Sequence, residues 1–512
     1  MMQPGRIVLK NGIIVDGTGA AAFRGSVRLE NGRILSVSHS QNGFSALDTG
    51  PEGEVIDCTG KVIAPGFIDA HSHSDLQILQ NRTEKLLQGV TSEVVGNCGF
   101  SPYPASQDPQ VLRDFANGIL CGDDQWRWES ASDYLRSARQ SNVATVTSLV
   151  GHGTLRIKVA GNSSRQLTPA ELDSMCGLLN NSLDEGAAGF SSGLMYSPGS
   201  GASKDELTAL ARIAACREVV YATHMRSYSA GLVDAVEEQL SIARASGCRL
   251  QISHLQAAGE DFWPLQQRAV AAIEEASAEG IDVSFDVYPW LAGSTVLTQI
   301  LPQTALDGGI PKLLARLDDP VDREKIRPGI KPEARWSGVV ITAAQKNEAG
   351  LVGRSIADIA NERGTAPEDA VMDILLEQDA QVTIVEHCQS RENLRALLAH
   401  PLATVVTDGV YTRGRSHPRL YATFPLLLGD VVRERKWLSL EDAIYKVTAR
   451  PAAIFKIEGR GRIAPGYVAD IVIFDPDAIH TEATYETPAV APQGIHSVWR
   501  EGRMTVNAGA VS

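Results

Sequence analysis

Hydrophobic and polar positions follow two different patterns along the chain. In residues 1–64 and 457–512, short runs of alternating apolar and polar residues are separated by Gly, Asn and Asp. Alternation with a period of two is typical of half-buried strands, and the separating residues favour turns. Neither end has an obvious core of its own. We therefore expect the two ends to pack together as one small β-sandwich of antiparallel strands.

The middle of the chain, residues 65–456, alternates short apolar runs with helical patterns, such as those at 168–185, 203–216, 229–246 and 264–279. About eight strand–helix units predict an α/β fold, a closed TIM-like (β/α)8 barrel. An open doubly wound sheet is the alternative, but the chain lacks a Gly-rich phosphate loop that opens a helix. The candidate strands are GFIDAHSH, SEVVGNCG, VATVTSLVGHG, AAGFSSGL, VVYATHM, RLQISHL, DVSFDVYP and ATVVTDG.

One section interrupts the strand–helix alternation. Residues from about 296 to about 344 contain many Pro, Gly and charged residues and little strand pattern. We interpret this section as an insertion after a barrel strand. Because loops at the carboxyl ends of barrel strands surround the active site, we expect the insertion to lie near its mouth.

The composition is that of an ordinary globular protein, with 43% hydrophobic and 21% charged residues. The net charge of −14 argues against a nucleic-acid-binding surface. It does not exclude a small anionic substrate, which needs only a local cationic pocket. No apolar run approaches 20 residues, so the sequence predicts no membrane span. The start, MMQPGRIVLKNG, lacks the apolar segment of a signal peptide. Seven cysteines without paired spacing favour a reducing cytoplasm.

Side chains that can bind a metal stand at the ends of several apolar runs. His71 and His73 are one residue apart after the first barrel strand, so their side chains point to the same side. In a barrel, the carboxyl ends of the strands meet on one face. Imidazole, thiolate and carboxylate groups together suit zinc. The predicted metal-site residues are His71, His73, Cys98, His224, His254 and Asp408.

Each of these residues also has a structural interpretation. Cys98 could be a small core residue, the histidines could be buried and hydrogen-bonded, and Asp408 could cap a turn. His152 follows an apolar run too, and we leave open whether it lines the site or stabilises the fold. His387 and Cys388, in VEHCQS, have no further partner in the sequence, so we leave them out of the site.

A set of longer motifs runs along nearly the whole chain. The motifs are PGFIDAHSHSD, GVTSEVVGNCGFSPYP, GHGTLR, GFSSGLMYSPG, THMRS, ISHLQ, DVYPWLAGSTVL and TDG followed by HPRLYATFP. Together, and in this order, they resemble the motifs of the N-acyl-D-amino-acid deacylases, or D-aminoacylases, of the amidohydrolase superfamily. HxH alone is typical of the superfamily, whereas the cysteine motif, DVYPW and HPR are more specific.

The resemblance implies a metal-bearing barrel with a β-sandwich built from both chain ends. It also implies that Cys98, His224 and His254 hold a tightly bound zinc ion. His71 and His73 would form a second, weaker site that Cys98 can bridge. No lysine ends a strand where many amidohydrolases carry a bridging carboxylated lysine, which favours a cysteine-centred site. The zinc would activate a water molecule, with Asp408 as general base and then general acid.

Substrate recognition requires a cation for the α-carboxylate of an N-acyl amino acid. Arg419, in SHPRLY, is the candidate because guanidinium binds carboxylate bidentately. Tyr288 and Ser294 resemble the hydroxyl donors of the family's carboxylate pocket. Many relatives carry a lysine where this chain has Gln256, so a preference for acidic side chains is not expected. Arg413 and Arg415 could contact an anionic substrate or face solvent.

Three functions remain in view at this point. The first is a zinc-dependent D-aminoacylase acting on small N-acyl amino acids or acylated peptide-like compounds, without nucleic-acid or membrane partners. The second is another amidohydrolase, such as a cyclic-amide hydrolase or a D-residue dipeptidase. A cyclic amide has no free α-carboxylate, so Arg419 favours the first. The third is a metal-binding protein without hydrolytic activity, which the retention of Asp408 argues against. The acyl group, the preferred side chain and the oligomeric state remain open.

Overall fold

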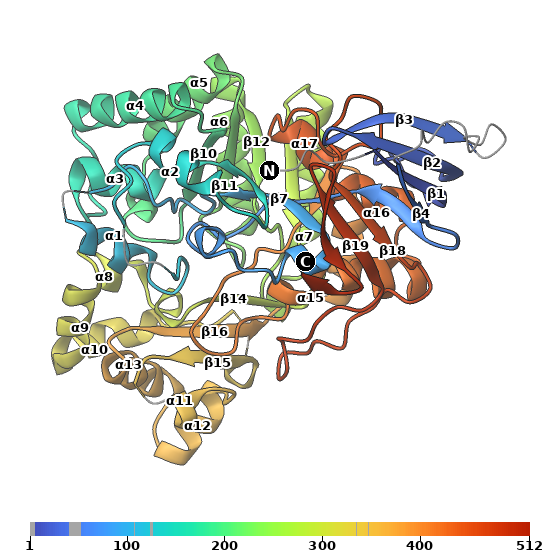
Figure 1. Ribbon diagram of the computed structural model, residues 1–512. Coiled ribbons are helices and arrows are strands. Elements are labelled where there is room, and N and C mark those ends of the chain that lie inside the picture. Colours follow the sequence, from blue (N-terminus) through green and yellow to red (C-terminus); the bar gives the residue numbers. More distant parts are fainter. Residues whose placement is uncertain are drawn as a thin grey trace.

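Both ends of the chain contribute to a single nine-stranded sheet. The computed structural model describes residues 6–39, 53–106, 108–122, 126–333, 335–346 and 348–511. Strand β5 (Val62–Pro65) pairs with β18 (Ile471–Phe474), which joins the first part of the chain to the last. Figure 1 shows the blue and red strands of this sheet side by side. The other strands are β1 (Ile7–Ile14), β2 (Phe23–Glu30), β3 (Arg33–His39), β4 (Glu54–Asp57), β19 (Ile495–Arg500), β20 (Arg503–Asn507) and β21 (Ala510–Val511).

The two ends of the chain also share one hydrophobic core. Leu9 and Val27 from the first strands are buried in the same cluster as Ile473 and Trp499 from the last ones. Neither set could bury these side chains alone, because one face of each piece would remain in water. The parts of the predicted N-terminal sandwich segment that fall on residues 1–5 and 40–52 lie outside the described residues.

The middle of the chain forms a closed barrel of parallel strands, which confirms the predicted fold class. Neighbouring strands pair in parallel register all along the sheet. A parallel bridge between Ser72 and Gly409 brings the first and last strands together. The strands are β6 (Phe67–Asp69), β7 (Val90–Val95), β8 (Thr145–Ser148), β9 (Val150–Gly151), β10 (Gly189–Gly193), β11 (Val220–His224), β12 (Arg249–Ile252), β13 (Val283–Val287) and β17 (Ala403–Val405).

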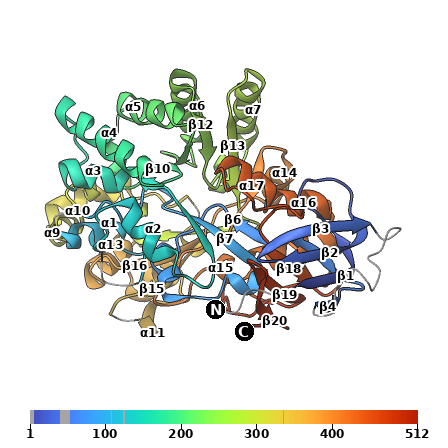
Figure 2. The same ribbon diagram turned by 45° about the horizontal axis from the view of Figure 1, so that its top comes forward.

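Helices cover the outside of the barrel, as Figure 2 shows for α4 to α7. The helix α4 (Pro169–Asp184) begins after Thr168, whose hydroxyl and the Glu171 carboxylate form a capping box. The other covering helices are α1 (Pro109–Ala116), α2 (Ala131–Ala138), α3 (His152–Ala160), α5 (Lys204–Cys216), α6 (Leu232–Ser246), α7 (Leu265–Ala278), α14 (Arg391–Ala399), α15 (Arg419–Leu426), α16 (Leu440–Lys446) and α17 (Ala449–Ile454). No helix among the described residues is both long and apolar enough to cross a bilayer.

The segment between β13 and β17 contains a subdomain that is larger than the predicted insertion. Its three strands, β14 (Ala292–Val296), β16 (Val382–His387) and β15 (Val339–Ala344), form an antiparallel sheet. The subdomain has its own core, which runs from Leu297 to Ile384 and thus extends beyond residue 344. Its helices are α8 (Gln303–Leu306), α9 (Ile310–Asp318), α10 (Pro320–Ile326), α11 (Glu348–Leu351), α12 (Ile356–Arg363) and α13 (Pro367–Glu377). The apolar periodicity of these helices is the same as that of barrel helices. The sequence pattern therefore did not show that the insertion continues beyond residue 344.

Candidate active site

The carboxyl ends of the barrel strands surround a cavity of about 120 Å³. This is the face on which barrels of this kind carry their active sites. All the residues predicted from the sequence line this cavity except His71, whose Nε2 atom lies 3.2 Å from the Cys98 thiol. The predicted lining residues are His73, Cys98, His224, His254, Gln256, Tyr288, Ser294, Asp408 and Arg419.

Backbone hydrogen bonds hold the histidine pair against the segment that carries Asp408. The amide of Asp408 donates to the carbonyl of His71 at 2.9 Å. The amide of His73 donates to the carbonyl of Gly409 at 3.3 Å. The first and last barrel strands are thereby connected at their carboxyl ends, and the carboxylate lies 3.2 Å from the Nε2 atom of His73.

Three of the predicted site residues have left-handed backbone conformations. The φ angles are 54° at Cys98, 35° at His254 and 48° at Asp408. Such angles are uncommon for residues other than glycine and cost about 1–3 kcal/mol each, so they persist only where the surroundings impose them. In each case a strand ends and the chain turns sharply, which directs the side chain into the barrel mouth.

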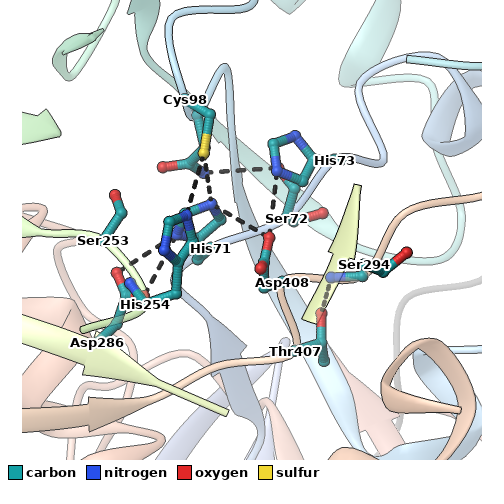
Figure 3. A network of polar contacts seen from close by, with 12 residues as sticks. His71, Ser72, His73, Cys98, Ser253, His254, Asp286, Ser294, Thr407 and Asp408 are labelled. Atoms are coloured by element: carbon teal, nitrogen blue, oxygen red, sulfur yellow. Dashed lines mark hydrogen bonds and ion pairs between the residues drawn. The ribbon is translucent and has the colours of Figure 1, made fainter. Parts of the chain in front are cut away.

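The metal-competent atoms form two groups that share His71 (Figure 3). The ligand atoms of His71, Cys98 and His254 lie within 4.8 Å of one another. Those of His71, His73 and Asp408 do so as well. The thiol of Cys98 lies 3.6 Å from the His254 Nε2 atom, so Cys98 contacts two histidines of the cluster.

His224 lies beside this cluster on the neighbouring strand, although it belongs to neither group of ligand atoms. Its ring centroid lies 4.6 Å from that of His254, and both of its ring nitrogens are buried without a hydrogen-bond partner among the described residues. Burial lowers the pKa of His224 well below its usual range and that of His254 to about 4. Both imidazoles are therefore neutral near pH 7, and the neutral ring is the form that binds metals.

The buried polar atoms fit a metal ion better than they fit one another. Burial alone would lower the pKa of His71, but Cys98, Asp286 and Asp408 raise it well above its usual value. Their combined charge thus favours a cation at this point of the structure. A buried nitrogen without a partner is costly, and several imidazoles have one here. Thiolate, imidazole and carboxylate are the ligands that zinc prefers.

The electrostatic surroundings of Asp408 keep it ionised. Burial would raise the pKa of this carboxyl, but Arg419, His71 and His73 hold it well below its usual value. The Arg419 guanidinium contacts one carboxylate oxygen at 3.0 Å, while His73 contacts the other. An ionised carboxylate beside the metal-competent groups can accept a proton.

The predicted substrate-binding residues meet beside Asp408. The Arg419 side chain is buried, stacks over the Tyr288 ring at 4.6 Å and lies 3.5 Å from the carbonyl of Ser294. The Tyr288 hydroxyl donates to the Gln256 side chain at 3.2 Å and accepts from Gln389 at 3.1 Å. Gln256, the departure from the family pattern, thus contacts the same tyrosine that we expected to bind a carboxylate.

Sequence reasoning missed Asp286, which supports two of the histidines. Its carboxylate lies 3.3 Å from the Nδ1 atom of His71 and accepts a 2.6 Å hydrogen bond from the amide of His254. Carboxylates that contact the free nitrogen of a metal-binding histidine fix its orientation. Asp286 lies in strand β13, and Tyr288, two residues later, directly follows the strand, so a period of two predicts that both face the same side. This two-residue spacing could have identified Asp286 as a site residue from the sequence, once Tyr288 was placed in the site.

Sequence reasoning also missed a buried ionic network behind the Asp408 segment. The Lys85 ammonium lies 2.7 Å from the Asp69 carboxylate and 3.0 Å from that of Glu93, and all three are buried. Asp69 in turn accepts hydrogen bonds from both the amide and the hydroxyl of Thr407. The network thus fixes the residue before Asp408.

His152 is part of a separate ionic network. Its Nε2 atom lies 2.7 Å from the Glu206 carboxylate, which also contacts Arg156. His152 is buried and does not line the active-site cavity, which favours its structural interpretation. Of the two residues that we left out of the site, His387 is exposed, whereas Cys388 lines the cavity. Arg413 and Arg415 do not line it.

Comparison with characterised proteins gives matches over almost the whole chain. The N-acyl-D-glutamate deacylase of Alcaligenes xylosoxydans xylosoxydans is 32% identical, over 97% of this chain and 92% of the relative. The D-aminoacylase of the same organism is 32% identical, over 98% of this chain and 94% of the relative.

Solved structures agree with these sequence matches. The N-acyl-D-glutamate deacylase of Bordetella bronchiseptica, in complex with zinc and a phosphonate inhibitor, has a TM-score of 0.82 at 30% identity. That match covers 98% of this chain and 97% of the other. A D-aminoacylase structure has a TM-score of 0.84 at 31% identity, covering 99% and 97% of the two chains. An L-hydantoinase of Arthrobacter aurescens, 16% identical with a TM-score of 0.58, shares the fold.

The fold and the site together define an amide hydrolase of the metal-dependent barrel class. The model of the amidohydrolase family matches residues 54–305 and 334–506. The chain belongs to the amidohydrolase family, and its near-full-length likeness places it among the N-acyl-D-amino-acid deacylases, or D-aminoacylases. This confirms the resemblance seen in the sequence motifs.

Proposed function

We propose that this protein removes the acyl group from N-acyl-D-amino acids with the help of zinc. The observation that carries the proposal is that the metal-competent residues and the substrate-binding residues line one cavity. It holds neutral imidazoles, a thiol and an ionised carboxylate, next to a buried arginine that can bind the substrate. A cyclic-amide hydrolase would have no use for this arginine, because its substrate has no free α-carboxylate.

The residues divide into two sets of ligands. Cys98, His224 and His254 would hold the tightly bound zinc, and His71 and His73 would hold a second, weaker metal ion. The thiol of Cys98 lies close enough to His71 and His254 to serve both positions. When bound, zinc polarises the amide carbonyl and lowers the pKa of a bound water towards about 7.

Asp408 is the group that transfers the proton between the attacking water and the leaving amine. Its carboxylate accepts a proton from the attacking water and passes it to the amine that leaves, so the same group serves as general base and general acid. Arg419 and His73 keep it ionised before the reaction and fix both of its oxygens. The products are a carboxylic acid and a free amino acid.

The α-carboxylate of the substrate binds to Arg419. The planar guanidinium offers several donors, and it is positioned by stacking on Tyr288. Ser294 and Tyr288 line the same part of the cavity and can add hydroxyl donors. Buried charge-assisted hydrogen bonds are the strong ones, so Arg419 anchors the end of the substrate that does not react.

The proposed function is tested by metal analysis and an amine-release assay on the purified protein. We expect bound zinc and release of free amino acid from N-acetyl-D-amino acids, much faster than from the L-enantiomers. Dihydrouracil, a hydantoin and a D-residue dipeptide test the alternatives in the same assay. A zinc-loaded sample that opens the cyclic amides but releases no amine from either enantiomer would contradict the proposal.

Replacing Arg419 with Lys is expected to raise KM for an N-acyl-D-amino acid about 10- to 100-fold. Lysine keeps the positive charge beside Asp408 but cannot bind the substrate carboxylate bidentately. The lost hydrogen bond to a charged group is worth about 1.5–3 kcal/mol. Steady-state kinetics measure the effect. Arg415→Lys, on the same segment but outside the cavity, is the matched control and should leave KM unchanged.

Replacing Gln256 with Lys is expected to shift the preference towards acidic side chains. The residue lines the cavity, and a charge-assisted contact could change the ratio of kcat/KM for N-acetyl-D-Glu over N-acetyl-D-Leu by about tenfold or more. Competition between the two substrates measures this ratio. Gln256→Met removes the amide without adding charge, so an equal shift in that variant would contradict the explanation.

Replacing Asp286 with Asn is expected to weaken zinc binding about 10- to 100-fold, since loss of a carboxylate that orients a ligand has effects of this size. Competition with a chromogenic chelator measures the affinity. Asp282→Asn is the control, because Asp282 precedes the same strand but pairs with Arg249 on the surface. Equal zinc affinity in both variants would show that Asp286 does not orient the ligands.

A further inference from the structure

A second cleft, of about 1130 Å³, lies where the β-sandwich meets the barrel. One wall is formed by the turn between β19 and β20. The other is formed by residues 138–146, which lead into strand β8 at its first residue, Thr145. The catalytic groups lie at the opposite, carboxyl ends of the strands. This cleft is therefore separate from the active site.

Positive charge gathers in this cleft although the whole chain carries a net charge of −14. One acidic residue, Glu501, is among the described residues that line it, and Glu501 is paired with Arg460 at 2.9 Å. A cleft lined by one sign of charge raises the local concentration of counter-ions. The arginines that line it are Arg33, Arg139, Arg460, Arg500 and Arg503.

Two of these arginines, Arg500 and Arg503, lie opposite each other in the sheet. Arg500 and Arg503 are direct partners in the register of β19 and β20, and like charges at such positions repel. The Nε atom of Arg500 is buried and has no hydrogen-bond partner in the described part of the chain. Burial and the nearby Arg460 lower the pKa of Arg500 to about 10.

The two walls of the cleft both contribute cations. Arg139 follows helix α2 on the barrel side, whereas Arg500 and Arg503 belong to the sandwich. Within the described residues, none of these three guanidinium groups forms an ion pair. Both the barrel and the sandwich thus contribute cations to the lining of one cleft, and an anion that binds only the folded state would stabilise it.

We propose that this cleft is a binding site for a small oxyanion with two or more negative charges, a phosphate or a dicarboxylate. Guanidinium groups bind both kinds of anion bidentately. The site is independent of the active-site chemistry, so a ligand here acts as a stabiliser or regulator and is not turned over.

The test is isothermal titration of the zinc-loaded protein with inorganic phosphate and, separately, with succinate, at constant ionic strength set with sodium chloride. We expect saturable binding of at least one anion and a rise of Tm that chloride does not cause. Phosphate alone, succinate alone, or both would identify the class of ligand. Absence of saturable binding with both anions would overturn the proposal.

Substitutions locate the bound anion. Arg500→Gln and Arg139→Gln are each expected to lower the affinity at least tenfold. Arg139 is exposed, so its replacement tests the site even if Arg500→Gln fails to fold. Arg395→Gln, on the exposed face of α14, removes the same charge elsewhere and should bind as the unmodified protein does. Equal affinity in Arg139→Gln and Arg395→Gln would place the anion outside this cleft and refute the proposal.

Discussion

Replacing Asp408 with Asn is expected to lower kcat for N-acyl-D-amino-acid hydrolysis by about 10²–10⁴-fold, the usual contribution of a general acid–base group. Asparagine has nearly the same shape but cannot take up a proton. It can still accept a hydrogen bond from Arg419, whose guanidinium lies 3.0 Å from the carboxylate, so the substrate-binding end of the cavity is retained. The loss should therefore appear in kcat more than in KM.

Two measurements make this result interpretable. Zinc content, measured on the same sample, separates loss of the base from loss of the metal. Asp430→Asn serves as the control, because Asp430 pairs with Arg435 on the surface, away from the cavity. If Asp408→Asn kept its zinc and more than a tenth of its kcat, Asp408 would not be the proton-transfer group.

Replacing Lys85 with Met is expected to lower the free energy of unfolding by about 3–5 kcal/mol, the usual cost of removing one partner of a buried ion pair. Burial would lower the pKa of Lys85, but Asp69 and Glu93 raise it, so the lysine is charged. Without it, the two buried carboxylates would have lost the cation that they share. Denaturant unfolding followed by fluorescence measures the difference.

A second buried lysine provides the matched control for Lys85. Lys446 donates to the backbone carbonyls of His400 and Ala403, and burial lowers its pKa to about 8. Lys446→Met therefore removes only neutral partners, and a smaller cost of about 1–2 kcal/mol is expected. Equal destabilisation in the two variants would show that the ionic network is not what makes Lys85 important.

The position of the site could be predicted because each candidate follows an apolar run. His224 ends strand β11 and His254 follows strand β12 by two residues, and a closed parallel barrel brings all such ends to one face. Helix α4 could be predicted almost to the residue, because Thr168 and Glu171 mark its start. These features depend on the local pattern of apolar and capping residues, and on the rule that the carboxyl ends of parallel barrel strands share one face.

Other features depend on contacts that no local pattern records. Lys85 stands in NRTEKLLQG, which looks like a solvated segment, and its partners Asp69 and Glu93 become neighbours only when the strands pair. The subdomain extends past residue 344 because β16 pairs in antiparallel fashion with β14 and β15. A short apolar run does not reveal whether it will join a parallel or an antiparallel sheet.

The pairing of β5 with β18 has a consequence for synthesis of the protein in the cell. About 400 residues separate β5 from β18, and at about 5–20 residues per second their synthesis takes roughly 20 to 80 seconds. During this time β5 lacks its β18 neighbour, and exposed strand edges are prone to aggregate. A chain interrupted before β18 would carry nearly the whole barrel but could not complete this sheet.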